Sequence, residues 1–192
     1  PEEAAAKARS IGFPVVLKGL GTRLTHKTER GLVRLSLGDE GVVRLAAEAV
    51  AAAAGADLEG YLIQPMLSGR RELVAGLFHD PQFGPVVMFG LGGVFTEALN
   101  DVVFRIAPID EREASGMIDD LRSRMLLGPF RGDRSANRES LVRTLTGLSR
   151  IGLELPDVAE VDINPLRVGP DGQATAVDAL IVLGERPAAQ AS

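Results

Sequence analysis

The stretch Val161-Asp162-Ile163-Asn164-Pro165-Leu166 decides how the rest of the chain is interpreted. Side chains along a β-strand point alternately to its two faces. A strand that buries Val161 and Ile163 therefore turns Asp162 and Asn164 together to the opposite face. Two polar oxygen-bearing side chains on one rigid surface are candidates for binding rather than for packing.

The residues after this stretch predict a hairpin. Pro165 is expected to end the strand, because proline has no N–H to donate to a ladder. Turn-forming residues at 169–172 then predict a returning strand over 173–182, which would bring Asp178 beside Asn164. Carboxylate and amide oxygens suit hard cations such as Mg²⁺. The segment alone also fits a solvated hairpin with a polar open face, so both interpretations stay open here.

Bulk composition narrows the class of protein. The chain has 192 residues, 45% of them hydrophobic and 24% charged, which is enough for one domain or two closely packed subdomains with a core. A net charge of −5 argues against general attraction to nucleic acid or an anionic membrane. The chain has no cysteine and no apolar run of the roughly 18 residues that span a bilayer, so a cytoplasmic protein is expected. Because it starts without methionine, it is expected to be a fragment of something longer.

Hydrophobic periodicity and capping residues predict an alternation of helices and strands. Helices are predicted at 1–10, 40–54, 111–123 and 138–151. Strands are predicted at 13–18, 32–37, 61–66, 72–79, 85–89 and 102–107, followed by the hairpin. The mixture indicates an α+β protein with an internal boundary near residues 55–60.

Two residues near the N-terminus could act on phosphate. Lys18 is expected at the end of an apolar strand, from which a lysine can reach a phosphate as a point charge. A lysine that simply extends from a strand end into water is the more common case. His26 lies in a polar loop, where it is either an exposed surface residue or a nucleophile or proton carrier near neutral pH.

The middle of the chain adds a glycine-rich run and two charged candidates. The run Gly90-Leu91-Gly92-Gly93 indicates either close approach of backbone to a ligand or a tight turn. Arg105 could steady a transferring phosphoryl group, or pair with Glu97 or Asp101 as a surface ion pair. Glu72 begins a strand. A lysine, a carboxylate and an Asn/Asp pair are the minimal set for holding a magnesium nucleotide, since phosphoryl transfer chiefly requires positioning and charge neutralisation.

Three motifs give the chain a resemblance to a known family. They are His26-Lys27-Thr28-Glu29, the run from Asp80 to Gly93 (DPQFGPVVMFGLGG), and Asp162-Ile163-Asn164-Pro165-Leu166. Their order and sequence resemble the ATP-grasp domain of ADP-forming acyl-CoA synthetases, relatives of succinyl-CoA synthetase, over about residues 1–182. The resemblance implies an ATP-grasp fold of two α+β subdomains with the nucleotide site between them. It implies a small subdomain at 1–59, a large one at 60–185 and a loose tail at 186–192.

The resemblance also implies roles for individual residues. Lys18, Gln64, Met66, Glu72, Gly92 and Gly93 correspond to the nucleotide site, with 64–66 as the hinge that holds adenine. Asn164 and Asp178 correspond to the Mg²⁺ ligands. Asp162 corresponds to an acidic position near an incoming phosphohistidine, His26 to a second histidine that relays the phosphoryl group in some members, and Arg105 is the candidate for steadying that group.

The family couples ATP, an acid and CoA to acyl-CoA, ADP and phosphate. This implies ATP or ADP with Mg²⁺ as cofactors, and CoA-binding and ligase domains, fused or separate, as partners in an enzyme that could be oligomeric. One departure is Gly31-Leu32-Val33, where the family usually has two glycines before the valine, so histidine movement is in question. The alternative function is a non-catalytic nucleotide- or ligand-sensing domain fused to a protein acetyltransferase, which has no reason to keep the metal pair.

Overall fold

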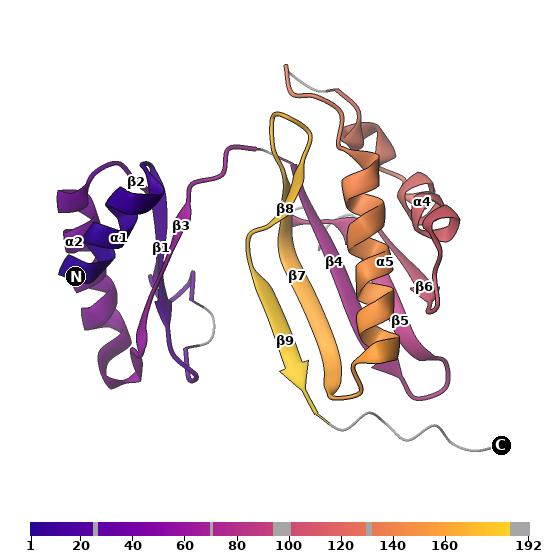
Figure 1. Ribbon diagram of the computed structural model, residues 1–192, viewed down its shortest axis with the longest axis horizontal. Coiled ribbons are helices and arrows are strands. Elements are labelled where there is room, and N and C mark those ends of the chain that lie inside the picture. The colour runs from indigo at the N-terminus through magenta and orange to yellow at the C-terminus, as the bar shows by residue number, and fades with distance from the viewer. Residues whose placement is uncertain (25–26, 70, 94–100, 130–131, 185–192) are drawn as a thin grey trace. The chain divides into compact units, whose positions relative to one another are not determined.

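The computed structural model describes residues 1–24, 27–69, 71–93, 101–129 and 132–184, and it divides into two compact units (Figure 1). The first unit is Pro1–Leu67 and the second is Ser68–Ser192. The predicted boundary lies between residues 59 and 60. The difference arises because strand β3 (Gly60–Pro65) pairs along its whole length with β1 (Val15–Leu20), which keeps it in the first unit.

The first unit is a three-stranded antiparallel sheet in the order β2-β1-β3. Its other elements are α1 (Glu2–Ile11), β2 (Val33–Leu37), α2 (Glu40–Ala54) and a short 3₁₀ turn, η1 (Gly55–Asp57). Both helices lie on the same face of the sheet (Figure 1). They bury small and branched side chains against that face, including Ala8 and Val50 from the helices and Leu17 from β1.

Local sequence explains the helices of this unit. Two glutamates in the first turn of α1 complement the helix dipole. Asp39 caps α2 by accepting a hydrogen bond from the Val42 N–H at 2.9 Å, as its position predicts. Gly55 ends that helix at φ +60°, a conformation that favours glycine. The predicted helices and strands of this unit are therefore confirmed within a few residues.

The second unit is a six-stranded antiparallel sheet covered by two helices. Its elements are β4 (Arg71–Asp80), β5 (Gly84–Leu91), β6 (Val102–Ile106), α4 (Glu111–Asp120), η3 (Arg124–Leu127), α5 (Arg138–Glu154), β7 (Val158–Val168), β8 (Ala174–Ala176) and β9 (Ala179–Leu183). The strand order is β6-β5-β4-β7-β8, with β9 also paired to β7. Among the described residues no helix combines the length and apolar character needed to cross a membrane.

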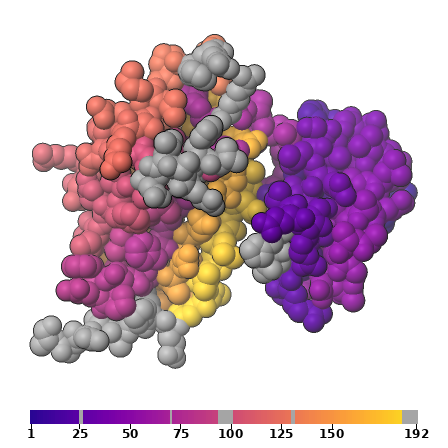
Figure 2. Space-filling model, turned by 180° about the vertical axis from the view of Figure 1, so that it is seen from behind, coloured from indigo at the N-terminus to yellow at the C-terminus, as the bar shows by residue number. Residues whose placement is uncertain are grey.

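Helices α4 and α5 cover one face of this sheet (Figure 1). Leu73, Ala75 and Leu77 of β4 are buried on that face. Helix α5 packs so closely that a Cβ on Gly152 would lie 2.8 Å from Leu77. The capping box of Asp110 with Glu113 starts α4 as predicted. We call the opposite face the open face; Figure 2 shows the molecule from the reverse side of Figure 1.

The hairpin departs from its prediction in two ways. Strand β7 does not end at Pro165 but continues to Val168. Leu73 pairs with Leu166 and Ala75 with Ile163, so one residue of β4 stands opposite two of β7, Asn164 and Pro165. This β-bulge accommodates the missing N–H of the proline inside the sheet. The predicted returning strand is likewise interrupted between β8 and β9.

Candidate functional site

The bulge and the interruption of the returning strand meet at Asn164 and Asp178. The Asn164 N–H donates to the Asp178 carbonyl at 3.2 Å, and the Val177 N–H donates to the Pro165 carbonyl at 3.0 Å. Both Asn164 and Asp178 are exposed. Bulges re-aim side chains at the point where regular pairing is lost. The fold therefore brings the two residues that the sequence predicts as a pair into backbone contact, although through a bulge rather than a simple hairpin turn.

Asp162 lies beside this pair on the open face. Its neighbours across the sheet are Gly76 of β4 and Leu180 of β9. Burial raises the pKa of Asp162, and the negative charges of Glu160 and Asp178 raise it further. The charge of Asp178 thus acts directly on Asp162. The three predicted residues of this segment form one acidic, oxygen-rich surface within the second unit.

The donor set fits a magnesium ion that is shared with phosphate. No group of three or more His, Cys, Asp or Glu side chains within the described ranges is placed to hold a metal alone. Mg²⁺ commonly takes one or two protein oxygens and fills its remaining positions with water and substrate phosphate. Asn164 and Asp178, both exposed, supply oxygens of the kind that this mode requires.

Glu72, near the start of β4 and close to the bulge in β7, is held against the glycine-rich run. Its side chain forms an ion pair with Arg167 of β7, which stands directly opposite it in the register. The Gly92 N–H donates to the Glu72 carbonyl at 2.8 Å. A Cβ on Gly93, which has φ +75°, would lie 3.0 Å from the Glu72 carboxylate. Glu72, Gly92 and Gly93, predicted separately to contact nucleotide, are therefore in contact with one another.

Lys18 lies inside a strand of the first unit rather than at its end. Strand β1 continues to Leu20, and Lys18 pairs with Val33 of β2 and Leu62 of β3. Only 5% of Lys18 is exposed. Its register places it on the helix-free face, since Leu17 points toward the helices. A lysine rising from the middle of a sheet is more rigidly placed than one at a strand end.

The predicted hinge is at the end of the same unit. Gln64 pairs with Val16, on the face that also carries Lys18. Both Gln64 and Met66 are half-buried. Met66 follows β3 and its N–H donates to the Pro14 carbonyl at 2.9 Å. Lys18 and Gln64 are thus brought to one face of the three-stranded sheet.

Two residues of the predicted site are not placed with the residues described above. Arg105 pairs with Asp120 of α4, and its strand partner Val87 belongs to the helix-covered core, so Arg105 lies on the face opposite the open one. The ion-pair interpretation of Arg105 is the one that the structure supports, with a different carboxylate from those expected. His26 lies outside the described residues.

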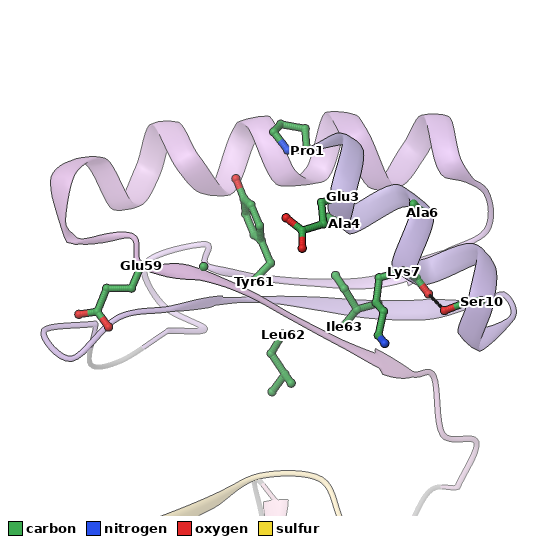
Figure 3. A pocket seen from close by; sticks show the side chains of 11 residues that line it. Pro1, Glu3, Ala4, Ala6, Lys7, Ser10, Glu59, Tyr61, Leu62 and Ile63 are labelled. Carbon is green, nitrogen blue, oxygen red and sulfur yellow. Dashed lines mark hydrogen bonds between the residues drawn. The ribbon is translucent and has the colours of Figure 1, made fainter.

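A groove of about 900 Å³ lies along the edge of β3 beneath α1 (Figure 3). Its polar lining includes Glu3, Lys7 and Glu59, and Ser10 donates to the Lys7 carbonyl at 2.7 Å. None of the residues predicted to bind nucleotide or metal lines it. The groove is therefore separate from the candidate site.

The sequence does not reveal the roles of two residues that organise the second unit. Arg167 stands opposite Glu72 because of the pairing register between β4 and β7. The alternation of apolar and polar residues along one strand does not reveal that register. Asp101 is 6% exposed and accepts hydrogen bonds from the N–H groups of Arg122 and Ser123 at 3.0 and 2.8 Å. Its signal in the sequence is only that of a loop aspartate.

Comparison with known proteins gives consistent matches. The family described as ATP-grasp domain matches residues 1–183. The chain is 41% identical over 188 residues to the ADP-forming acetate–CoA ligase I of Archaeoglobus fulgidus, covering 96% of this chain and 27% of that protein. It is 40% identical over 187 residues to the beta subunit of the ADP-forming acetate–CoA ligase I of Pyrococcus furiosus, covering 95% of this chain and 80% of the subunit.

One solved structure is similar to this chain over nearly its whole length. It is the dinucleotide forming acetyl-coenzyme A synthetase 1 of Ca. Korarchaeum cryptofilum, with coenzyme A and Mg-AMPPCP, whose phosphohistidine segment points towards the nucleotide binding site. The TM-score is 0.84 at 40% sequence identity, and the match covers 95% of this chain and 82% of that one.

Proposed function

Because this chain belongs to the family of ATP-grasp domains, we propose that it is the nucleotide-binding part of an ADP-forming acyl-CoA synthetase. The complete reaction converts an acid, CoA and ATP to acyl-CoA, ADP and phosphate. This chain exchanges a phosphoryl group between the magnesium nucleotide and a phosphohistidine of a CoA-binding partner. It spans only 27% of the length of the fused relative from Archaeoglobus, so the acyl chemistry is assigned to other domains.

The observation that carries this proposal is the surface formed by Asp162, Asn164 and Asp178. Asn164 and Asp178 meet through a backbone hydrogen bond of 3.2 Å at a bulge. A domain that only senses a ligand has no reason to keep this amide and carboxylate pair. The similar structure from Korarchaeum holds Mg-AMPPCP and has a phosphohistidine segment that points towards the nucleotide binding site, which supports this proposal.

We assign a role in nucleotide binding to residues of the second unit and, separately, to residues of the first. Asn164 and Asp178 would hold Mg²⁺, which when bound neutralises charge on the phosphate oxygens. Lys18 binds phosphate as a fixed positive charge on its strand. Gln64 and Met66 hold the base.

Glu72, Gly92 and Gly93 complete the nucleotide contacts. The backbone of the two glycines lies against Glu72, with the Gly92 N–H donating to its carbonyl at 2.8 Å. The absence of side chains there lets the main chain approach a ligand closely.

Asp162 is assigned to the histidine that delivers the phosphoryl group. As a P–O bond to ADP forms, the P–N bond of the phosphohistidine breaks, and a carboxylate can hold the released imidazole. His26 is assigned to the relay between partner and nucleotide. We leave Arg105 out of this machinery, since its guanidinium pairs with Asp120.

The partner carries the CoA-binding and ligase domains, either fused to this chain or as a separate subunit. Both arrangements occur among the relatives, since one is a single ligase and another is a beta subunit. The complete enzyme could then be an oligomer. We also propose a cytoplasmic location, where ATP and CoA are both supplied and where a chain without cysteine is unremarkable.

A labelling experiment on the complete enzyme tests the proposed function. ATP labelled at the γ-phosphate should transfer label to a histidine, in a form stable to alkali and labile to acid. Adding ADP should return the label to ATP. If magnesium nucleotide binds but no protein histidine acquires label, the non-catalytic sensing function is favoured instead.

A further inference from the structure

The ion pair between Glu72 and Arg167 stands out on the open face of the second unit. Glu72 of β4 and Arg167 of β7 are direct partners in the antiparallel register, so both side chains leave the sheet on one side. The Arg167 guanidinium donates through Nη2 to Glu72 Oε1. Their side chains are 29% and 22% exposed, so the pair is partly desolvated but still open to a ligand.

The backbone after β5 encloses the same carboxylate. A Cβ on Gly93 would lie 3.0 Å from Glu72 Oε2, and a Cβ on Gly92 would lie 2.8 Å from the Leu73 carbonyl oxygen. One oxygen of Glu72 thus faces Arg167 and the other faces Gly93. The carboxylate is fixed by an ion pair on one side and by close backbone on the other.

Arg167 also belongs to β7, the strand that carries Asn164 of the metal pair. In β7, Asn164 is separated from Arg167 by Pro165 of the bulge and by the buried residue Leu166. An unpaired carboxylate near a polyphosphate would repel it, and the repulsion grows as water is excluded. A guanidinium in contact with Glu72 removes that repulsion and holds the carboxylate in one orientation.

We propose that Arg167 is a positioning residue for nucleotide binding that acts through Glu72. This inference rests on the proposed function and extends it to a residue outside the three motifs of the family. Arg167 aims Glu72 at the nucleotide and compensates its charge. The geometry of the guanidinium matters, because a planar donor fixes a carboxylate better than an ammonium does.

A double-mutant cycle on the complete protein tests the inference. Calorimetry with Mg·ATP would compare the wild type with Arg167→Met, Glu72→Gln and the double variant. Arg167→Met should weaken nucleotide binding about tenfold, within the range of coupling between residues in direct contact. In the Glu72→Gln background the same change should have little further effect. Arg167→Lys should restore part of the affinity by returning the charge.

The matched control is Arg143→Met. Arg143 pairs with Glu139 on the exposed surface of α5, with exposures of 62% and 78%, and it should bind nucleotide as the wild type does. Thermal melts identify any variant that fails to fold, and Arg167→Lys then carries the comparison. If Arg167→Met binds like the control, or weakens binding equally in the Glu72→Gln background, the inference is overturned. A wild-type protein that does not bind Mg·ATP would instead overturn the proposed function and this inference with it.

Discussion

Replacing Gly92 by alanine should damage both the packing of the second unit and its nucleotide contacts. An added Cβ would lie 2.8 Å from the Leu73 carbonyl oxygen and 2.9 Å from its carbonyl carbon. These are backbone atoms of a central strand, so they cannot yield as the end of a flexible side chain can. The hydrogen bond from the Gly92 N–H to the Glu72 carbonyl, 2.8 Å long, would be lengthened as the chain moves away.

The magnitude follows from these two effects. Forcing an extra carbon into packed surroundings costs about 1–3 kcal/mol. Weakening one backbone hydrogen bond adds about 1 kcal/mol. We therefore expect Gly92→Ala to lower the free energy of unfolding by about 2–4 kcal/mol. Because the same backbone lies against Glu72, nucleotide affinity should fall as well, even at temperatures where the variant remains folded.

Gly147→Ala is the matched control. Gly147 lies in α5 and a Cβ there would meet nothing within 4 Å. Alanine in a helix interior is favoured over glycine by about 0.5–1 kcal/mol, so this variant should be slightly more stable.

The assay must report on the second unit. The chain has no tryptophan, and its one tyrosine, Tyr61, lies in the first unit. Hydrogen exchange of peptides from β4 and β5 follows the second unit directly, and circular dichroism follows the melting of the whole chain. If Gly92→Ala exchanges and melts like Gly147→Ala, the close packing of the glycine run on β4 is refuted.

Three further predictions concern stability, phosphate binding and phosphoryl relay. Asp101→Ala should lower the free energy of unfolding by about 1–3 kcal/mol, because it removes the acceptor of the part-buried N–H groups of Arg122 and Ser123. Burial alone would raise the pKa of Asp101, but hydrogen bonds from Ser123 and Arg122 outweigh it and hold the pKa below its usual range. This stabilisation is therefore present above the unfolded-state pKa and lost as pH falls through the folded-state pKa; acid titrations in which wild type and Asp101→Ala lose stability alike would contradict it. Lys18→Met should weaken Mg·ATP binding at least tenfold in calorimetry, since a unit charge pair at about 4 Å near a protein surface is worth about 4 kcal/mol before desolvation; unchanged affinity would exclude a phosphate contact. His26 should acquire phosphate in the complete enzyme, detected by mass spectrometry under alkaline conditions, and label found only on the partner would remove its relay role.

Much of the fold could be predicted because local signals agree with it. Asp39 and the pair Asp110 and Glu113 cap their helices as expected. In each case the interaction that forms the element is made by residues close together in the sequence.

The errors come from interactions between distant residues. Pro165 was expected to end its strand, but pairing with β4 on one side and with β8 and β9 on the other carries the strand past it. Similarly, β3 was expected in the second unit, but pairing with β1 keeps it in the first. Neither the bulge nor this pairing leaves a signal in a single segment.

The candidate site shows the same division. Asn164 and Asp178 could be predicted as a pair because a hairpin joins them over a short stretch of chain. The partner of Arg105 could not, because Asp120 is brought to it by the packing of α4 on the sheet. Arg167 was overlooked for the same reason, since only the β4–β7 register sets it opposite Glu72.

Calorimetric titration of ATP and ADP with and without Mg²⁺ tests the central claim most directly. The complete protein should bind both nucleotides only when magnesium is present. Asn164→Ala combined with Asp178→Ala should abolish this binding while leaving the thermal transition nearly unchanged, because both side chains are exposed. Binding that is equally tight without magnesium, or that survives the double substitution, would contradict the assignment of this pair as the metal site.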